Sequence, residues 1–261
     1  MILDIFQIDA FTDKLFHGNQ ACVIPLNKWL DDELLLKIAK ENAVSETAFF
    51  IKNGNYIQLR WFTPDIEIDL CGHATLAVAY VLRELYNCNL SQITFKTLSG
   101  DLFVSYDKDI YYLDLPSRMP KISLLPSEIS SSLNFQPLEV FKSRDYLLVY
   151  EKELDVRNIK IDRNHFDKIN LGYGGVIITS KGDNVDFVSR FFTPQATILE
   201  DPVTGSAHCS LVPFWSKRLG LKNLKAHQIS ERMGKLICRD LDSKVRIGGS
   251  AKLFFSGKIK L

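Results

Sequence analysis

The segment Arg60-Trp61-Phe62-Thr63-Pro64 recurs as Arg190-Phe191-Phe192-Thr193-Pro194, which lies 130 residues further along the chain. In both copies, aromatic and apolar residues typical of a buried strand end at a proline, which cannot continue a hydrogen-bonded ladder. Both copies are followed by a glycine, small residues and an apolar run of helical length, beginning at Gly72 and Gly205. We therefore expect an internal duplication of two similar halves, each placing a strand before an apolar helix.

Composition restricts the classes of function that the chain can have. The 261 residues are 46% apolar and 24% charged, as in ordinary globular proteins, and the net charge is +1. This balance predicts no attraction to nucleic acid or to an anionic membrane. The five cysteines are scattered, the first residues do not resemble a signal peptide, and the apolar run Leu76–Leu82 is too short to span a bilayer. We expect a soluble cytoplasmic protein.

The helix predicted over residues 73–85 is apolar on nearly every face until Arg83. Because such a helix must be buried on all sides, we expect a sheet to wrap around it. Prolines 116, 120 and 126 mark the best linker. The predicted domains are therefore residues 1–117 and 118–251, and the last strand, within residues 252–261, can return to the first domain.

Each glycine-bearing loop leads directly into a helix, and the first N–H groups of a helix lack intrahelical partners. Such ends bind carboxylate or phosphate groups. Neither loop matches a nucleotide-binding glycine motif, so a small carboxylate is the better candidate. The loops predict a site in the cleft between the domains, with Gly72, His73, Gly205 and Ser206 as binding residues. The alternative is that the glycines only form turns.

Three further side chains near these loops could take part in chemistry. Cys71 and Asp201 each lie eleven residues after the arginine of their repeat, which suggests that they occupy equivalent positions. Asp201 is either a helix cap or a polar group facing the substrate. His73 would sit in a first helical turn, where the dipole favours a neutral imidazole. Cys71 is either a small apolar residue or, at a helix start, an acid/base thiol.

Glu46 begins a strand of aromatic residues at a position where the second half carries Gly174-Gly175. A carboxylate beside such a strand can lose its water shell, which suits a proton shuttle. The alternative is an exposed charge at the end of the strand.

Taken together, these motifs resemble the PhzF-type phenazine-biosynthesis isomerase family. They occur in order across nearly the whole chain: Gly18-Asn19, Ser45-Glu46-Thr47-Ala48-Phe49, Phe62-Thr63-Pro64, Glu67-Ile68-Asp69-Leu70-Cys71-Gly72-His73-Ala74-Thr75 and Glu200-Asp201-Pro202-Val203-Thr204-Gly205-Ser206-Ala207-His208. The resemblance implies the fold of diaminopimelate epimerase, an α/β (α+β) fold. It has two pseudo-twofold domains, each a curled, mostly antiparallel sheet around a central apolar helix.

The resemblance also implies roles for individual residues. Glu46 would be the proton shuttle, with His73, Asp201 and Ser206 lining the site and Asn19 among the substrate-binding residues. Proton transfer would need no cofactor and no metal, and the protein would be a homodimer. One departure is that Gln20 stands where the family has proline, so the edge of the site near Gln20 can differ.

The sequence thus predicts an isomerase that moves a proton on a small carboxylic acid, with Glu46, His73 and Asp201 as catalytic residues. Two alternatives stay open. One is an amino-acid racemase or epimerase that uses Cys71, although diaminopimelate epimerase uses a pair of cysteines and only one is present here. The other is a non-catalytic protein that binds a small carboxylate. The sequence names neither the substrate nor its pathway.

Overall fold

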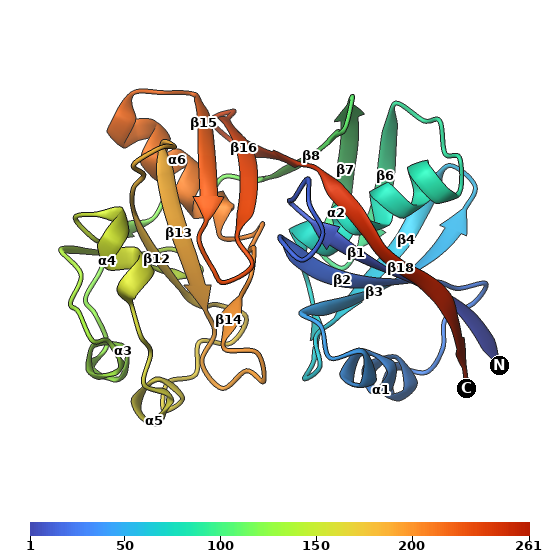
Figure 1. The fold of residues 1–261 in the computed structure, drawn as a ribbon, viewed down its shortest axis with the longest axis horizontal. Coiled ribbons are helices and arrows are strands. Elements are labelled where there is room, and N and C mark those ends of the chain that lie inside the picture. The colour runs from blue at the N-terminus through green and yellow to red at the C-terminus, as the bar shows by residue number, and fades with distance from the viewer. The chain divides into compact units, whose positions relative to one another are not determined.

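The computed structural model describes all 261 residues, and their contacts divide the chain into two compact units (Figure 1). Unit 1 comprises Met1–Leu115 and Arg246–Leu261, and unit 2 comprises Pro116–Val245. The last residues join unit 1 because strand β18 (Ala251–Lys260) pairs antiparallel with β1 (Ile2–Ala10). No helix combines the length and the low polarity that crossing a bilayer would require.

Unit 1 contains a mostly antiparallel sheet with the strand order β18-β1-β2-β3-β4-β6-β7, in which only β2/β3 and β4/β6 are parallel. Strand β8 continues this order beside β7, and the short β5 pairs with the end of β4. The remaining elements of this part of the chain are β2 (Asn19–Pro25), α1 (Asp32–Asn42), β3 (Glu46–Asn53), β4 (Tyr56–Phe62), β5 (Glu67–Ile68), α2 (Gly72–Tyr80), the π-helix η1 (Val81–Leu85), β6 (Gln92–Thr97), β7 (Gly100–Asp107) and β8 (Ile110–Pro116).

Unit 2 repeats this plan with the strand order β9-β10-β11-β12-β13-β15-β16, and its parallel pairs are β11/β12 and β13/β15. Strands β10, β11, β12, β13, β15 and β16 therefore correspond to β1, β2, β3, β4, β6 and β7. The elements are β9 (Lys121–Ile122), α3 (Ser127–Ser132), β10 (Glu139–Lys142), β11 (Tyr146–Val149), α4 (Glu153–Asn158), α5 (Arg163–Phe166), β12 (Val176–Lys181), β13 (Phe187–Phe192), β14 (Glu200–Asp201), α6 (His208–Leu219), β15 (Asn223–Gln228) and β16 (Gly234–Asp240). Strand β17 (Lys244–Gly249) begins in unit 2 and continues into the part of the chain that belongs to unit 1.

The central helix of unit 1 is buried on every side, as the sequence predicts. Every residue from Gly72 to Ala79 is buried, and α2 packs against β1, β2, β3, β7 and β18. The helix has no polar face, so the curled sheet removes its whole surface from water, which is the main source of its stability. The predicted helix over 73–85 differs at its end, because the last turn, Val81–Leu85, is a π-helix.

The two copies of the repeated segment form the same ion pair. Arg60 donates from Nε and Nη2 to Glu67 at 2.7 and 2.6 Å, and Arg190 donates in the same way to Glu200 at 2.7 and 2.8 Å. Each guanidinium also covers the phenylalanine two residues later, with distances to the ring centroid of 5.1 and 4.8 Å. Because geometry as well as sequence is repeated, strand β4 and its turn correspond to strand β13 and its turn.

Candidate active site

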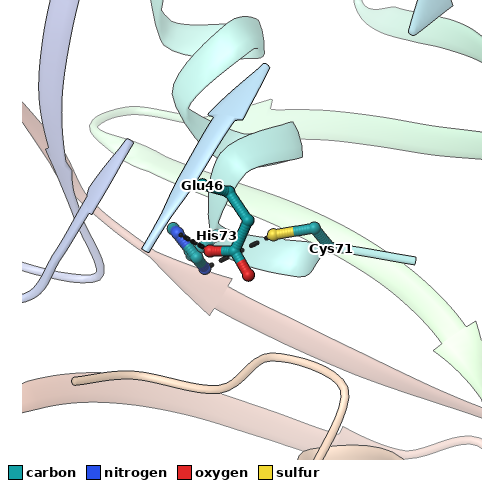
Figure 2. A group of neighbouring side chains, drawn as sticks. All are labelled: Glu46, Cys71 and His73. Atoms are coloured by element: carbon teal, nitrogen blue, oxygen red, sulfur yellow. Dashed lines mark hydrogen bonds and ion pairs between the residues drawn. The ribbon is translucent and has the colours of Figure 1, made fainter. Parts of the chain in front are cut away.

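Four side chains of unit 1 that the sequence singles out lie together at the start of α2. Asn19 begins β2 and Glu46 begins β3, and these parallel strands lie side by side because Ala21 pairs with Glu46. Cys71 has extended backbone geometry and ends the segment that leads into α2, so His73 falls in the first helical turn. Figure 2 shows the side chains of Glu46, Cys71 and His73 pointing toward one another.

The imidazole of His73 is at the centre of this cluster. Its Nε2 lies 3.0 Å from Oε2 of Glu46. Its Nδ1 lies 3.1 Å from the amide nitrogen of Asn19 and 3.5 Å from the sulfur of Cys71. An amide that donates to Nδ1 leaves the ring proton on Nε2, facing the Glu46 carboxylate. If the ring gains a second proton, Asn19 can present its oxygen instead, so it can serve both charge states.

The Glu46–His73 pair is shielded from water. The side chain of His73 is 2% exposed and that of Glu46 is 12% exposed. Oε2 of Glu46 and Nε2 of His73 are buried, and neither makes an aligned hydrogen bond despite the short distance between them. Buried polar atoms that lack such bonds are rare and occur at functional sites. The pair therefore has the geometry to exchange a proton with a bound molecule that completes these bonds.

The charges in the cluster change the acidity of its members. Burial of the imidazole lowers the pKa of His73, but Cys71 and Glu46 raise it, and the result lies well above the ordinary value of 6.5. Burial, reinforced by the charge of Glu46, raises the pKa of the Cys71 thiol to about 11. A thiol with this pKa is protonated at neutral pH, so the Glu46 carboxylate is the negative group that favours the imidazolium.

Replacing Glu46 by glutamine is therefore expected to lower the pKa of His73, because burial then acts with less opposition. A histidine whose pKa is raised by folding stabilises the folded state fully below its unfolded pKa of about 6.5, and this stability is lost as the pH rises through the folded pKa. NMR titration of the His73 imidazole signals in the wild-type protein and in the variant measures the shift. An unchanged His73 pKa in Glu46→Gln would contradict this coupling.

The same three residues offer a carboxylate, a thiol and an imidazole, which are ligand types that zinc accepts. Their ligand atoms lie within 4.8 Å of one another. However, Glu46 approaches Nε2 whereas Cys71 approaches Nδ1, and a metal ion bonds to only one nitrogen of the ring. An ion held by all three would require one of these contacts to change. The arrangement as it stands is better suited to proton transfer than to ligation.

The remaining predicted site residues lie in unit 2, on the loop before α6. Asp201 ends β14, and its carboxylate accepts a hydrogen bond from Oγ1 of Thr204 at 2.5 Å. Gln228, which is fully buried, donates to the backbone oxygen of Asp201 and accepts from the backbone N–H of Thr204, both at 2.8 Å. Ser206 is 8% exposed and follows Gly205 into the helix. The loop is thus fixed by internal hydrogen bonds.

The expected equivalence of Cys71 and Asp201 is wrong. Sheet register pairs Phe62 with Glu67 in unit 1 and Phe192 with Glu200 in unit 2. The turn of unit 2 is therefore three residues longer than that of unit 1, and counting eleven residues from each arginine does not reach equivalent positions. Asp201 corresponds to Ile68, and the counterpart of Cys71 is Thr204. The same register makes Ser206 the counterpart of His73.

Register confirms that the counterpart of Glu46 is a glycine. Thr47 pairs with Phe62, and Val176 pairs with Phe192, so Glu46 corresponds to Gly175. A Cβ atom at Gly175 would lie 2.4 Å from Cζ of Phe191 and 2.7 Å from the backbone oxygen of Phe192. Packing in unit 2 therefore excludes a side chain at this position, and the carboxylate is confined to unit 1.

We expect Gly175→Ala to destabilise the protein by about 1–3 kcal/mol, because the added methyl group overpacks a rigid position. The control is Gly257→Ala, where the nearest atom to the new Cβ is 3.9 Å away. Urea unfolding of the two variants measures the difference in free energy. Equal stability of the two variants would show that Gly175 is not sterically required.

Sequence reasoning missed two polar side chains in unit 2, the buried Gln228 and the partly exposed Arg144. Gln228 lies in an ordinary strand, 24 residues after the Thr204 that it contacts, and no local pattern signals this. Arg144 donates from Nη2 to the hydroxyl of Ser206 at 2.9 Å. Part of this arrangement can be recognised in the sequence, because Arg144-Asp145 is a charged pair immediately before the apolar strand β11.

The profile of the family described as phenazine biosynthesis-like protein matches residues 8–257. The chain belongs to this family. An uncharacterized isomerase of Pseudomonas aeruginosa is 44% identical over 263 residues, and the match covers the whole of both chains. The crystal structure of a PhzF-family phenazine biosynthesis protein from Enterococcus faecalis superposes with a TM-score of 0.94 at 44% identity, also over the whole of both chains. The predicted family is confirmed.

The phenazine biosynthesis-like fold extends to epimerases of distant sequence. A hydroxyproline epimerase from Agrobacterium vitis aligns with a TM-score of 0.65 at 9% identity, covering 100% of this chain and 93% of the epimerase. At this identity the likeness shows the fold alone. It confirms the predicted α/β fold of the diaminopimelate epimerase type, in which each half curls a sheet around an apolar helix.

Proposed function

We propose that this protein is an isomerase that moves a proton on a small carboxylic acid without a cofactor. The Glu46–His73 pair carries the proposal, because it is a buried carboxylate–imidazole contact of 3.0 Å whose two facing atoms have no aligned hydrogen bond. The isomerase description of the Pseudomonas aeruginosa relative supports the reaction class. Neither observation names the substrate.

In the proposed mechanism, the carboxylate of Glu46 takes a proton from a carbon next to an activating group and returns it to another carbon. His73 holds the carboxylate through Nε2 and supplies positive charge as negative charge develops on the substrate. Asn19 fixes the ring from the opposite nitrogen. A positioned acid/base of this kind typically accelerates a reaction about 10²–10⁴-fold, and orientation and fixed dipoles supply the remainder.

The roles of the unit 2 residues belong to the same proposal. Asp201 orients the substrate or relays a proton, and the N–H groups of Gly205 and Ser206 hold its carboxylate, as those of Gly72 and His73 also can. The hydrogen bonds of Gln228 and Thr204 support these roles because they hold the loop in one conformation. The homodimer and the cytoplasmic location stay predictions.

Solvent isotope uptake tests the reaction class directly. Pools of small cyclic and amino-bearing carboxylic acids are incubated with the protein in D₂O and analysed by mass spectrometry. We expect one member to gain mass in units of one deuterium and to yield an isomer of the same formula. Ligands that bind without gaining deuterium would overturn the proposal and favour the non-catalytic binding protein.

The racemase alternative assigns a base to Cys71, and the structure favours it less. A base must be deprotonated, whereas burial raises the pKa of this thiol to about 11. We expect Cys71→Ser to keep deuterium uptake within about threefold of the wild-type rate, since serine preserves the small size and a hydrogen-bonding atom near Nδ1 of His73. A loss of 10²-fold or more in this variant would favour the thiol mechanism.

A further inference from the structure

Sheet register identifies the residues of unit 2 that correspond to the proton-transfer cluster of unit 1. Cys22 pairs with Thr47 in unit 1, and Tyr146 pairs with Val176 in unit 2. Because Thr47 corresponds to Val176, Cys22 corresponds to Tyr146. The residues two and three positions earlier then also correspond, which matches Gln20 with Arg144 and Asn19 with Ser143. The counterparts of Glu46 and His73 are Gly175 and Ser206. Unit 2 therefore has a guanidinium group and two hydroxyls where unit 1 has two amides and an imidazole, and it has a glycine in place of the carboxylate.

Arg144 is held in one orientation by a buried carboxylate. Its Nε and Nη2 donate to Asp145 at 3.1 and 3.0 Å. Asp145 is 1% exposed and also accepts the backbone N–H of Gly175 at 3.0 Å. A side chain at Gly175 would collide with Phe191, so unit 2 has no counterpart of the Glu46 carboxylate. The backbone N–H of this glycine instead helps to hold Asp145 in place. The preorganised guanidinium then donates from Nη2 to Ser206 at 2.9 Å.

Donors remain free around Ser206. The hydroxyl of Ser206 accepts from Arg144, so its own hydrogen can be given to an incoming anion. Nη1 of Arg144 makes no hydrogen bond, and the side chain itself is 22% exposed, which leaves it accessible. Such planar, fixed donors match the geometry of a carboxylate.

A second arginine lies near the same helical turn. The backbone N–H of Arg118 donates to the backbone oxygen of Cys209 at 2.8 Å, which places this residue beside the first turn of α6. Nη1 of Arg118 is buried without a partner, and no carboxylate pairs with this side chain. Burial raises the pKa of the Cys209 thiol to about 11, and the charges of Arg118 and Arg144 both oppose that rise. Both guanidinium groups therefore act on the same turn.

We propose that Arg144, Ser206 and Arg118 form a carboxylate-binding site in unit 2, with Arg144 as a substrate-binding residue that makes the protein selective for acids over neutral analogues. The identity of the bound acid as the substrate rests on the proposed function, whereas binding of the anion does not. In this assignment, the donors of unit 2 bind the carboxylate group of the substrate. Arg144 thus stands at the position of unit 2 that corresponds to Gln20 of unit 1.

Benzoate serves as the probe and benzamide, its neutral counterpart, as the control ligand, in NMR titrations of ¹⁵N-labelled protein. We expect benzoate, but not benzamide, to shift the Nε–H signal of Arg144 and the amide signal of Ser206. Arg144→Gln and Arg118→Gln should each weaken benzoate binding about 10-fold or more. Arg239→Gln, at an exposed arginine of β16 in the same unit, should change nothing.

Two results would overturn the site: no benzoate-dependent shift at Arg144 in the wild-type protein, or undiminished benzoate affinity in Arg144→Gln. The benzoate-dependent NMR shifts of the wild-type protein test the site even if a variant fails to fold. Glu46→Gln separates this proposal from the proposed function, because it should keep benzoate affinity while losing deuterium uptake. If no substrate exchanges deuterium but benzoate binding depends on Arg144, the anion site stands and the isomerase assignment fails.

Discussion

Glu46→Gln is expected to slow deuterium uptake into the substrate about 10²–10⁴-fold, the contribution of one positioned acid/base. Glutamine keeps the size and the hydrogen-bonding shape of the side chain but cannot accept a proton from carbon. Because the side chain is 12% exposed and faces Nε2 of His73, no water molecule or neighbouring carboxylate can easily replace it. The measurement is the rate of mass increase in D₂O by the purified variant.

The matched control for this variant is Glu41→Gln, an exposed glutamate of helix α1. It removes the same charge from the same unit without touching the cluster, so deuterium uptake should stay at the wild-type rate. Substrate affinity should change only a few-fold in Glu46→Gln, because the carboxylate acts mainly in the transition state. Full turnover by Glu46→Gln would remove Glu46 from the mechanism.

The importance of Glu46 could be predicted in part from the sequence, because the repeat aligns this glutamate with glycines in the second half. Aromatic strands ending at a proline, followed by a glycine and a helix that is apolar all round, recur 130 residues apart. Both patterns are local in the sequence, and the distribution of apolar residues in each indicates which faces of the strand or helix are buried. They were sufficient to predict two similar halves, a buried α2 and a glycine opposite Glu46.

The sequence alone does not show which residues of the two units correspond when the loops between paired strands differ in length. The pairing of Asp201 with Cys71 failed because the turn between Phe192 and Glu200 is longer than that between Phe62 and Glu67, and only strand pairing reveals the difference. Contacts over long sequence distances were equally hidden. Arg144 lies 62 residues before Ser206, and Asn19 lies 54 residues before His73, so neither contact has a local signature.

The two units keep a common framework but differ in the residues near the start of the central helix. The ion pairs Arg60–Glu67 and Arg190–Glu200 are kept in both units because each closes the turn that leads toward the central helix. The residues that differ are those at the helix start and the strand starts facing it. Divergence at these positions changes the charge of the site without disturbing the packing of the sheet, since the sheet is held by strand pairing elsewhere.

Two substitutions at His73 should distinguish the roles of its nitrogens and produce the second large loss of activity. The amide of glutamine can reach the position of Nε2 and donate to Glu46, whereas the amide of asparagine can reach only the position of Nδ1, near Asn19 and Cys71. We expect His73→Asn to slow deuterium uptake about 10²-fold or more and His73→Gln to slow it less. Circular dichroism establishes that both variants are folded.

The double variant Glu46→Gln/His73→Gln tests whether the two residues work as one unit. If His73 acts only by holding the Glu46 carboxylate and balancing its charge, removing it after Glu46 has gone should cost little more. The double variant is therefore expected to exchange deuterium at about the rate of Glu46→Gln alone, since groups in direct contact are strongly non-additive. Multiplied losses would instead mean that His73 contacts the substrate independently. Glu46 and His73 would then each act on the substrate separately, rather than as a single carboxylate–imidazole pair.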